Sequence, residues 1–382
     1  VGIGNENWGC GGSMSPDFYA NEYKRYQCFC KNYGDNKLYK VACGPNAEDY
    51  NWTKELMSRI DHLQANGISL HCYTVPGDWE HRGSATDFSD EEYYSTISNA
   101  LHIEDIIKKH LAIMDEYDPN HDIDLLVDEW GTWYNVEPGT NPAFLYQQNT
   151  MRDAIVAAAS LNIFNKHSDR IAMANIAQVV NVLQAMILTE DTKILKTPTY
   201  DVFQMYKEHQ NATLVESYVA DAANRINEPV ISYNDISIPA LSESVSVTEQ
   251  NGQKLLTITL SNTSLTDSLS VELELPIISE WNYPNLKTAP CRYSGSAYLN
   301  NLIICGHNYT SHFGTLKNLW EGDIATFTDM DGNVFIYKMV ERETLNPTDI
   351  EGMESGNWDL TLFTCTVGGQ SRVTIRFELE ED

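Results

Sequence analysis

The first 210 residues alternate short apolar runs with longer amphipathic ones, and this alternation limits the possible folds more than any other feature. The apolar runs are Val1–Asn5, Leu38–Ala42, Gly67–His71, Ile123–Asp128 and Ile171–Ile176. Apolar residues recur at helical spacing in the intervening segments Phe18–Tyr33, Trp52–Ala65, Glu91–Tyr117 and Tyr146–Lys166, and in the later segment Tyr200–His209. Strands that alternate with helices indicate parallel strands joined by crossover helices.

Five such strand–helix units leave two architectures open. A closed (β/α)8 barrel requires eight strands, and here the chain opens at Val1 inside a run that is typical of a strand. The units could form an open five-stranded sheet. Alternatively, they could form the C-terminal part of a barrel whose first strands lie outside this chain. The abrupt opening at Val1 favours the second interpretation.

From about Leu214 the helical spacing stops and β-branched alternation takes over. Strands are predicted at Ser244–Thr248, Leu255–Ser261, Ser268–Leu275, Leu302–Cys305, Ile324–Thr328, Val334–Val340, Leu360–Thr364 and Val373–Glu378, with hairpin turns at Asn251-Gly252 and Asp331-Gly332. We therefore predict an α/β plus all-β protein: a partial (β/α)8 barrel over 1–213, β-sandwich strands over 214–275 and a further β-barrel segment over 276–382.

Composition excludes several classes of partner. The chain has 25 basic and 54 acidic residues, a net charge of −29, and such a field repels nucleic acid and anionic membranes. No apolar run approaches the roughly 20 residues that a membrane span needs. Eight cysteines occur without CxxC pairs, so they give no zinc signature. We expect no nucleic-acid partner, no membrane partner, no metal and no cofactor.

Two carboxylates stand at the ends of predicted strands. Glu6 ends the first strand and Glu129 ends the fourth. In parallel α/β barrels the carboxyl ends of the strands form the active face, so both side chains should enter one cleft. Two facing carboxyl groups supply what glycosidic cleavage requires: one protonates the leaving oxygen and the other attacks the anomeric carbon. The alternative is a pair of exposed loop acids in a very acidic chain.

Aromatic residues accompany these strand ends, as sugar-binding sites require. The residues are Trp8, Tyr73, Trp130, Trp133 and Tyr134.

Four stretches in the same region resemble, in order, the α-L-arabinofuranosidases of glycoside hydrolase family 51. They are Gly2–Gly12 (GIGNENWGCGG), Ser69–Thr74 (SLHCYT), Leu126–Tyr134 (LVDEWGTWY) and Met173–Gln184 (MANIAQVVNVLQ). The resemblance runs from Val1 to about Leu275. It implies that the five predicted strands are barrel strands four to eight.

The same resemblance implies roles for individual residues. Glu6 would be the general acid/base and Glu129 the nucleophile of a retaining mechanism, with carboxyl groups roughly 5 Å apart. Tyr73 would orient Glu129. Asn5 would bind a sugar hydroxyl, and His71 and Gln178 would line the sugar pocket.

The implied substrate is an arabinose-containing oligosaccharide or polysaccharide of the arabinoxylan or arabinan type, from which terminal α-L-arabinofuranosyl residues are released. The implied location is the cytoplasm rather than the exterior. Because early barrel strands are lacking, we expect little or no activity from this chain alone. A complementary N-terminal fragment or a homo-oligomer would then complete the site.

A second group of reactive residues lies near the C-terminus. His307 follows one predicted strand, Cys365 ends another and Arg372 begins the next. A thiol, an imidazole and a guanidinium suit acyl transfer, as nucleophile, proton shuttle and oxyanion stabiliser. The alternative is a buried cysteine beside a histidine in a turn.

This segment resembles the sortase transpeptidases from about Pro276 to Glu378. The motifs follow in sortase order: Gly306-His307-Asn308, Phe313–Leu316, Glu321–Asp323, Thr361–Cys365 and Arg372. The resemblance implies that Cys365 is the nucleophile, His307 the acid/base and Arg372 the oxyanion or substrate stabiliser, with Arg376 as a less favoured substitute. Sortases act outside the membrane on cell-wall sorting signals, so the two resemblances conflict over location. Two families that both lack their leading segments indicate a natural fusion, an engineered chain or a mis-assembled reading frame.

Three functions therefore remain open. The leading one is a furanosidase-type hydrolase, and the alternative is a cysteine transpeptidase that carries an inert hydrolase remnant. A third, non-enzymatic class is a chain that only binds glycans.

Overall fold

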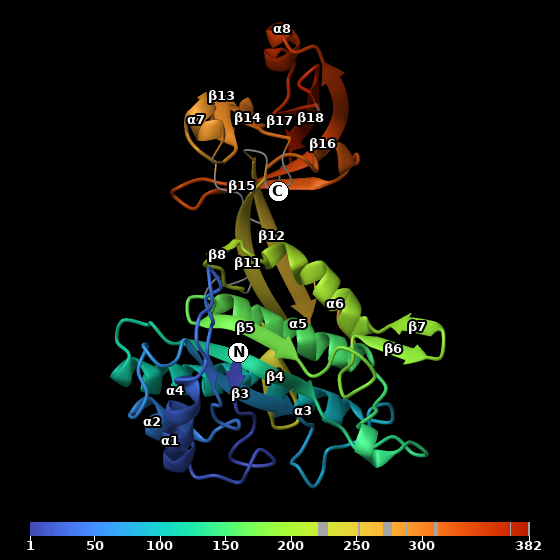
Figure 1. Cartoon of the computed structure of the whole chain (residues 1–382). Helices are drawn as coiled ribbons and strands as arrows, with labels where there is room; N and C mark the ends of the chain where they lie inside the picture. Colours follow the sequence, from blue (N-terminus) through green and yellow to red (C-terminus); the bar gives the residue numbers. More distant parts are fainter. Residues whose placement is uncertain are drawn as a thin grey trace. The chain divides into compact units, whose positions relative to one another are not determined.

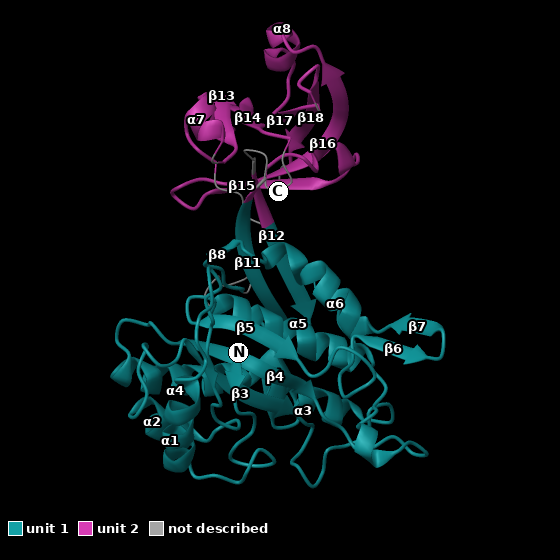
Figure 2. Ribbon diagram, viewed as in Figure 1, with its two compact units in different colours: residues 1–248, 257–269 teal, residues 249–256, 270–382 magenta. Residues whose placement is uncertain are grey.

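The computed structural model describes residues 1–220, 228–250, 253–269, 277–287, 289–308, 312–366 and 368–380 (Figure 1). The chain divides into two compact units (Figure 2). The first contains Val1–Thr248 and Thr257–Leu269, and the second contains Glu249–Leu256 and Ser270–Asp382. No helix among the described residues is both long enough and apolar enough to cross a membrane.

A five-stranded parallel sheet forms the centre of the first unit. Its strands are β1 (Gly2–Ile3), β2 (Val41–Ala42), β3 (Gly67–Thr74), β4 (Asp124–Thr132) and β5 (Ile171–Ile176). They lie in chain order, and every neighbouring pair is parallel. The strand–helix alternation predicted from the sequence is confirmed, although β1 and β2 are shorter than the apolar runs that predict them.

Helices connect these strands, as parallel pairing requires. They are α1 (Pro16–Gln27), α2 (Tyr50–Met57), α3 (Asp90–Leu101), α4 (Ile103–Tyr117) and α5 (Met151–Lys166), and α6 (Pro198–Tyr206) follows the last strand of the sheet. The single helix predicted over Glu91–Tyr117 is wrong in one respect, because it is divided at His102 into α3 and α4. Capping boxes begin α3 at Ser89 and α5 at Thr150, and each satisfies backbone N–H groups that the first turn leaves unpaired.

The core of the first unit lies between this sheet and its helices. Trp52 and Leu56 of α2 pack with Ile68 and Leu70 of β3 and with Trp130 of β4, and all five are at most 1% exposed. Burial of one such side chain contributes roughly 1.5–3 kcal/mol. The sheet is open: β1 and β5 are its two edges, which makes the first unit a half-barrel.

Smaller β elements lie wholly or partly in the first unit. They are the hairpin β6 (Ile187–Glu190) and β7 (Lys193–Lys196), the hairpin β9 (Val230–Tyr233) and β10 (Ile236–Pro239), and a three-stranded sheet of β8 (Thr213–Val215), β11 (Leu241–Gln250) and β12 (Gln253–Asn262). Neither hairpin was predicted. The predicted turn Asn251-Gly252 and residues 270–275 of the predicted strand Ser268–Leu275 lie outside the described residues.

The second unit contains a six-stranded mixed sheet in the order β13-β14-β17-β18-β16-β15. Its strands are β13 (Cys291–Ser294), β14 (Leu302–Gly306), β15 (Ile324–Thr328), β16 (Val334–Leu345), β17 (Leu360–Cys365) and β18 (Arg372–Leu379). The five strands predicted from Leu302 onward are confirmed. So is the hairpin at Asp331-Gly332, where Thr328 pairs with Val334 and Gly332 has a φ of +86°.

Short helices complete both units. They are α7 (Tyr283–Leu286), α8 (Ile350–Glu354) and the 3-10 turns η1 (Pro142–Phe144), η2 (Lys207–His209), η3 (Ala297–Leu299) and η4 (Leu316–Asn318). The core of the second unit includes Leu302, Ile304, Tyr337, Ile375 and Phe377, all buried.

Candidate active site

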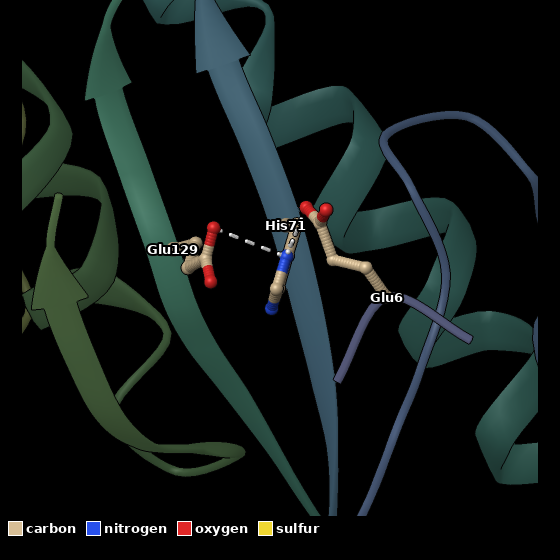
Figure 3. Close-up of side chains that lie close together, drawn as sticks. All are labelled: Glu6, His71 and Glu129. Carbon is tan, nitrogen blue, oxygen red and sulfur yellow. Dashed lines mark hydrogen bonds and ion pairs between the residues drawn. The ribbon is translucent and has the colours of Figure 1, made fainter. Parts of the chain in front are cut away.

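Glu6 and Glu129 converge at the carboxyl ends of the parallel strands, on either side of His71 (Figure 3). Glu6 follows β1, His71 lies in β3 and Glu129 lies in β4. One carboxylate oxygen from each glutamate and one ring nitrogen of His71 all lie within 4.8 Å of one another. The two acids therefore belong to one cluster and are not separate loop acids.

The turn after β1 aims the carboxylate of Glu6 into this site. Glu6 has a φ of +46°, a conformation that costs a non-glycine residue free energy. Its carbonyl oxygen accepts hydrogen bonds from the N–H groups of Gly9 at 2.8 Å and Gly11 at 2.9 Å. Gly4 has a φ of +106°, a conformation that strains any residue with a Cβ, and a Cβ there would lie 3.0 Å from the ring of Tyr19. The turn is held by hydrogen bonds and close packing.

His71 is the centre of the cluster and is only 3% exposed. Its Nδ1 lies 2.9 Å from Oε1 of Glu6 and 3.4 Å from Oε2 of Glu129. Its Nε2 lies 3.1 Å from Oδ1 of Asp128. Burial lowers the pKa of His71, whereas the carboxylates of Asp128, Glu6 and Glu129 raise it by a larger amount. The pKa of His71 therefore lies above its usual range. The sequence predicts a pocket-lining residue here; in the structure His71 also bridges both acids.

A register shift between β3 and β4 brings three carboxylates around one imidazole. Ser69 lies opposite Leu126, whereas His71 lies opposite Glu129, so two steps along β3 match three along β4. This is the pattern of a β-bulge. Successive residues of a regular strand point to opposite faces, yet Asp128 and Glu129 both contact His71. Asp128 is the residue that sequence reasoning missed, because periodicity alone places it on the other face.

Tyr73 lies two residues further along β3 and holds the carboxylate of Glu129. Its hydroxyl donates a hydrogen bond to Oε2 of Glu129 at 2.7 Å. Burial, together with this bond, raises the pKa of Tyr73 well above its usual range, so the phenol remains a donor at neutral pH. The contact expected between Tyr73 and Glu129 is present.

Asn5 and Gln178 lie at the surface. Asn5 is exposed directly before Glu6, and Gln178 is exposed just after β5. The backbone N–H of Gln178 donates to the carbonyl of Val182 at 3.2 Å. Their contacts with a sugar stay predictions.

The predicted aromatic cluster is only partly at the site. Trp130 is buried and packs edge-on against Phe164 at 5.1 Å. Tyr134 is buried too, with the guanidinium of Arg152 4.0 Å from the centre of its ring. These two predictions were wrong, because both side chains belong to the packing beneath the site.

Trp133 and Tyr73 do form an aromatic wall beside Glu129, with ring centres 4.9 Å apart. Trp79, which is 51% exposed, joins them with its ring 5.5 Å from that of Trp133. Trp79 was not among the predicted site residues. Its position in the loop after β3 was the available signal, since loops at this end of parallel strands carry site residues.

Cys10 was also missed. It is exposed, and its thiol donates a hydrogen bond to Oε2 of Glu6 at 3.1 Å. This bond raises the pKa of Cys10.

In the second unit, strand register brings His307, Cys365 and Arg372 to one end of the sheet. Gly306 of β14 lies opposite Thr364 of β17 in a parallel pair, so His307 and Cys365 follow at adjacent strand ends. Cys365 lies opposite Arg372 of β18. Burial, with the positive charge of Lys287, lowers the pKa of His307.

The two arginines of β18 differ in what they contact. Arg372 is partly exposed, and its Nη1 donates to the carbonyls of Gly369 and Ser371, both at 3.2 Å. Arg376 is 1% exposed and lies opposite Thr361, away from Cys365. Its guanidinium pairs with Glu343 at 2.7 Å. Arg376 is therefore a buried structural residue, and the suggestion that it could replace Arg372 was wrong.

Known protein families match both the hydrolase-like and the sortase-like segments of the chain. The family model of the α-L-arabinofuranosidase C-terminal domain matches residues 128–289, and that of the sortase domain matches residues 268–380. An intracellular exo-α-L-arabinofuranosidase of Bacteroides ovatus is 47% identical over 275 residues, which are 72% of this chain and 52% of that protein.

Two solved structures resemble the first unit. The GH51 arabinofuranosidase from Xanthomonas axonopodis pv. citri is 43% identical with a TM-score of 0.64, over 70% of this chain and 52% of that one. The thermostable GH51 α-L-arabinofuranosidase from Thermotoga petrophila is 27% identical with a TM-score of 0.51, over 68% of this chain and 51% of that one.

The chain spans about half the length of these relatives. Over the shared half, both the sequence identity and the fold agree with theirs. About the first 275 residues of the chain are therefore similar in sequence and fold to the α-L-arabinofuranosidases of glycoside hydrolase family 51, and a segment that matches the sortase domain follows them.

Proposed function

We propose that this chain carries the catalytic carboxylates of a retaining α-L-arabinofuranosidase, with Glu129 as nucleophile and Glu6 as general acid/base. One observation supports this most directly: an oxygen of Glu6 and an oxygen of Glu129 lie within 4.8 Å of each other. Retaining glycosidases hold their carboxyl groups about 5 Å apart, whereas inverting enzymes leave room for a water molecule between them.

The geometry supports a double-displacement reaction. Glu129 attacks the anomeric carbon while Glu6 gives its proton to the leaving oxygen, so the glycosidic bond breaks and an arabinosyl ester forms. Water then attacks the ester, Glu6 accepts the proton, and arabinose leaves with Glu129 restored. The hydroxyl of Tyr73 fixes one oxygen of Glu129, which leaves the other oxygen to react.

The substrate would be a glycan of the arabinoxylan or arabinan type with terminal α-L-arabinofuranosyl residues. Asn5 would bind a sugar hydroxyl, and His71 and Gln178 would line the pocket. The relatives' names support a glycan ligand, and so does the aromatic wall beside Glu129, of which Trp79 is exposed. The five strands would correspond to barrel strands four to eight, and the name of the Bacteroides relative supports a cytoplasmic location.

A single-turnover experiment tests this proposal without steady-state activity, which suits a chain that spans half of its relatives. An aryl arabinofuranoside with a good leaving group needs little acid assistance, so Glu6→Ala should still form the ester but hydrolyse it slowly. We expect intact mass spectrometry to show one added arabinosyl group, and peptide mapping to place it on Glu129.

Two variants make this result decisive. Glu129→Gln in the Glu6→Ala background should carry no arabinosyl group, whereas Asp122→Asn, which changes a surface carboxylate after α4, should label as before. Labelling that persists without the Glu129 carboxylate, or that maps to another residue, would overturn the assignment.

A second activity is proposed for the second unit because its strand register places His307, Cys365 and Arg372 at one end of the sheet. We propose that Cys365 is the nucleophile of a cysteine transpeptidase acting on cell-wall sorting signals, with His307 as acid/base and Arg372 stabilising the oxyanion. A thiol-reactive sorting-peptide analogue should label wild type but not Cys365→Ala, and Cys305→Ala should label normally because Cys305 is buried. Equal labelling of all three proteins would exclude this activity.

A further inference from the structure

The carboxylate cluster also has the composition of a transition-metal site. Glu6, His71 and Glu129 each offer one ligand atom, and these atoms lie within 4.8 Å of one another (Figure 3). Zn²⁺ binds imidazole nitrogen and carboxylate oxygen at about 2.0–2.2 Å. Nδ1 of His71 is already 2.9 Å and 3.4 Å from the two oxygens, so a small inward movement of flexible glutamate side chains would complete three bonds.

The surroundings of His71 give a second, independent indication of a metal ligand. Metal-binding histidines almost always donate their other ring N–H to a carboxylate or carbonyl, which fixes the tautomer and the ring orientation. Here Nε2 of His71 lies 3.1 Å from Oδ1 of Asp128. In the metal-free chain Nδ1 shares a proton with Oε1 of Glu6 at 2.9 Å. A metal ion would displace that proton, while Nε2 would keep its own beside Asp128. The β-bulge that brings Asp128 to His71 therefore also prepares Nδ1 for a metal ion.

Access and charge fit the same ligand. The side chains of Glu6 and Glu129 are 20% and 30% exposed, so an ion can enter from solvent and keep a water molecule as its fourth ligand. Two carboxylates neutralise the charge of a divalent ion. A nitrogen with two oxygens favours Zn²⁺ over Mg²⁺ or Ca²⁺, which prefer all-oxygen ligands.

We propose that Glu6, His71 and Glu129 form a Zn²⁺ site, supported by Asp128, whose occupation closes the sugar site. The ion would take the oxygen atoms needed for attack and for proton transfer, so bound Zn²⁺ would compete with the glycan. This competition rests on the proposed hydrolase function, whereas Zn²⁺ binding itself does not.

Direct binding measurements test the site. Isothermal titration of the metal-free full chain with Zn²⁺ should give one high-affinity site, and Co²⁺ as a substitute should show visible absorption of a low-coordinate complex. His71→Ala should weaken Zn²⁺ binding at least tenfold. Glu6→Gln, which keeps the side-chain shape, should also weaken it and does not depend on the tolerance of the buried position 71.

The matched control is His102, an exposed imidazole whose Nε2 lies 3.1 Å from Glu48 and whose Nδ1 lies 3.5 Å from Asp105. His102→Ala should change the affinity less than twofold. Wild-type affinity in both His71→Ala and Glu6→Gln, or an equal loss in His102→Ala, would overturn the assignment. Circular dichroism checks that each variant is folded.

Covalent labelling separates this proposal from the hydrolase function. Zn²⁺ should slow ester formation on Glu129 in the Asp122→Asn and wild-type chains, measured as the first-turnover release of the aryl leaving group, and EDTA should restore it. Zinc binding without any labelling would leave the metal site standing and remove the hydrolase function. Labelling that saturating Zn²⁺ does not slow would remove the proposed metal site.

Discussion

The two reactive clusters of this chain are assembled in different ways. In the first unit, the functional groups contact one another: His71 touches Glu6, Asp128 and Glu129, and Tyr73 holds Glu129. In the second unit, strand register brings the groups to one end of a sheet, while the guanidinium of Arg372 bonds to loop carbonyls. Side-chain contacts in the first unit fix where the charged groups lie. Strand register in the second unit fixes which strand ends are neighbours.

The largest expected effect is the complete loss of one covalent label while the label on the other cluster stays unchanged. In the Glu6→Ala background, Glu129→Gln should abolish arabinosyl labelling, because the proposed nucleophile is lost, and should leave thiol labelling of Cys365 unchanged. Cys365→Ala should do the reverse. Both labels can be measured by mass spectrometry on one sample, and loss of both labels in either variant would contradict separate sites.

The next effect concerns stability in the second unit. Arg376→Met leaves the Glu343 carboxylate unpaired and removes bonds to Met353 and Thr361, which should cost about 2–3 kcal/mol. Arg372→Met should change the free energy of unfolding by less than about 0.5 kcal/mol, since its bonds are at the surface. Hydrogen exchange of the β17 and β18 amides measures the change in unfolding free energy for both variants. Equal changes would show that the buried contacts of Arg376 do not stabilise the unit.

A smaller effect should follow from removing one hydroxyl beside Glu129. Tyr73→Phe loses a hydrogen bond to a charged group, worth about 1.5–3 kcal/mol, so arabinosyl labelling should slow about 10–100-fold. Tyr23→Phe is the control, because its hydroxyl bonds to the carbonyl of Gln64 at 3.0 Å. Similar labelling rates in the two variants would show that Tyr73 does not position Glu129.

The smallest expected effect is on acid stability. In the first unit, hydrogen bonds from His167 and Lys108 outweigh partial burial and lower the pKa of Glu104 to about 2. Stability from this group is full above its ordinary pKa of 4.5 and is lost as pH falls towards 2. Glu104→Gln should flatten the pH dependence of α4 amide exchange between these values.

Asp329 is the corresponding group in the second unit. Hydrogen bonds from Tyr298 and Asn333 lower the pKa of Asp329 to about 2. Asp329→Asn should therefore flatten the pH dependence of β15 and β16 amide exchange and leave α4 unchanged. A response of α4 to the Asp329 variant would contradict local origins for the two effects.

Much of the fold could be predicted because it depends on local patterns. Strand Gly67–Thr74 and helix Met151–Lys166 follow from apolar spacing, and the hairpin at Gly332 follows from a residue that tolerates positive φ. The break at His102 was missed because apolar spacing continues across it. Trp130 and Tyr134 were misplaced because aromatic residues serve both cores and sugar sites, and only packing distinguishes the two.

The sequence by itself determined which residues are available at strand ends: Glu6 and Glu129 in the first unit, and His307, Cys365 and Arg372 in the second. Period and order carry this information, since parallel strands end on the same edge of a sheet. Only the tertiary structure decided that Asp128 contacts His71, that Cys10 donates a hydrogen bond to Glu6 and that Arg376 forms a salt bridge with Glu343. A β-bulge, a tight turn and a buried ion pair depend on contacts between distant segments, and sequence periodicity does not encode those contacts.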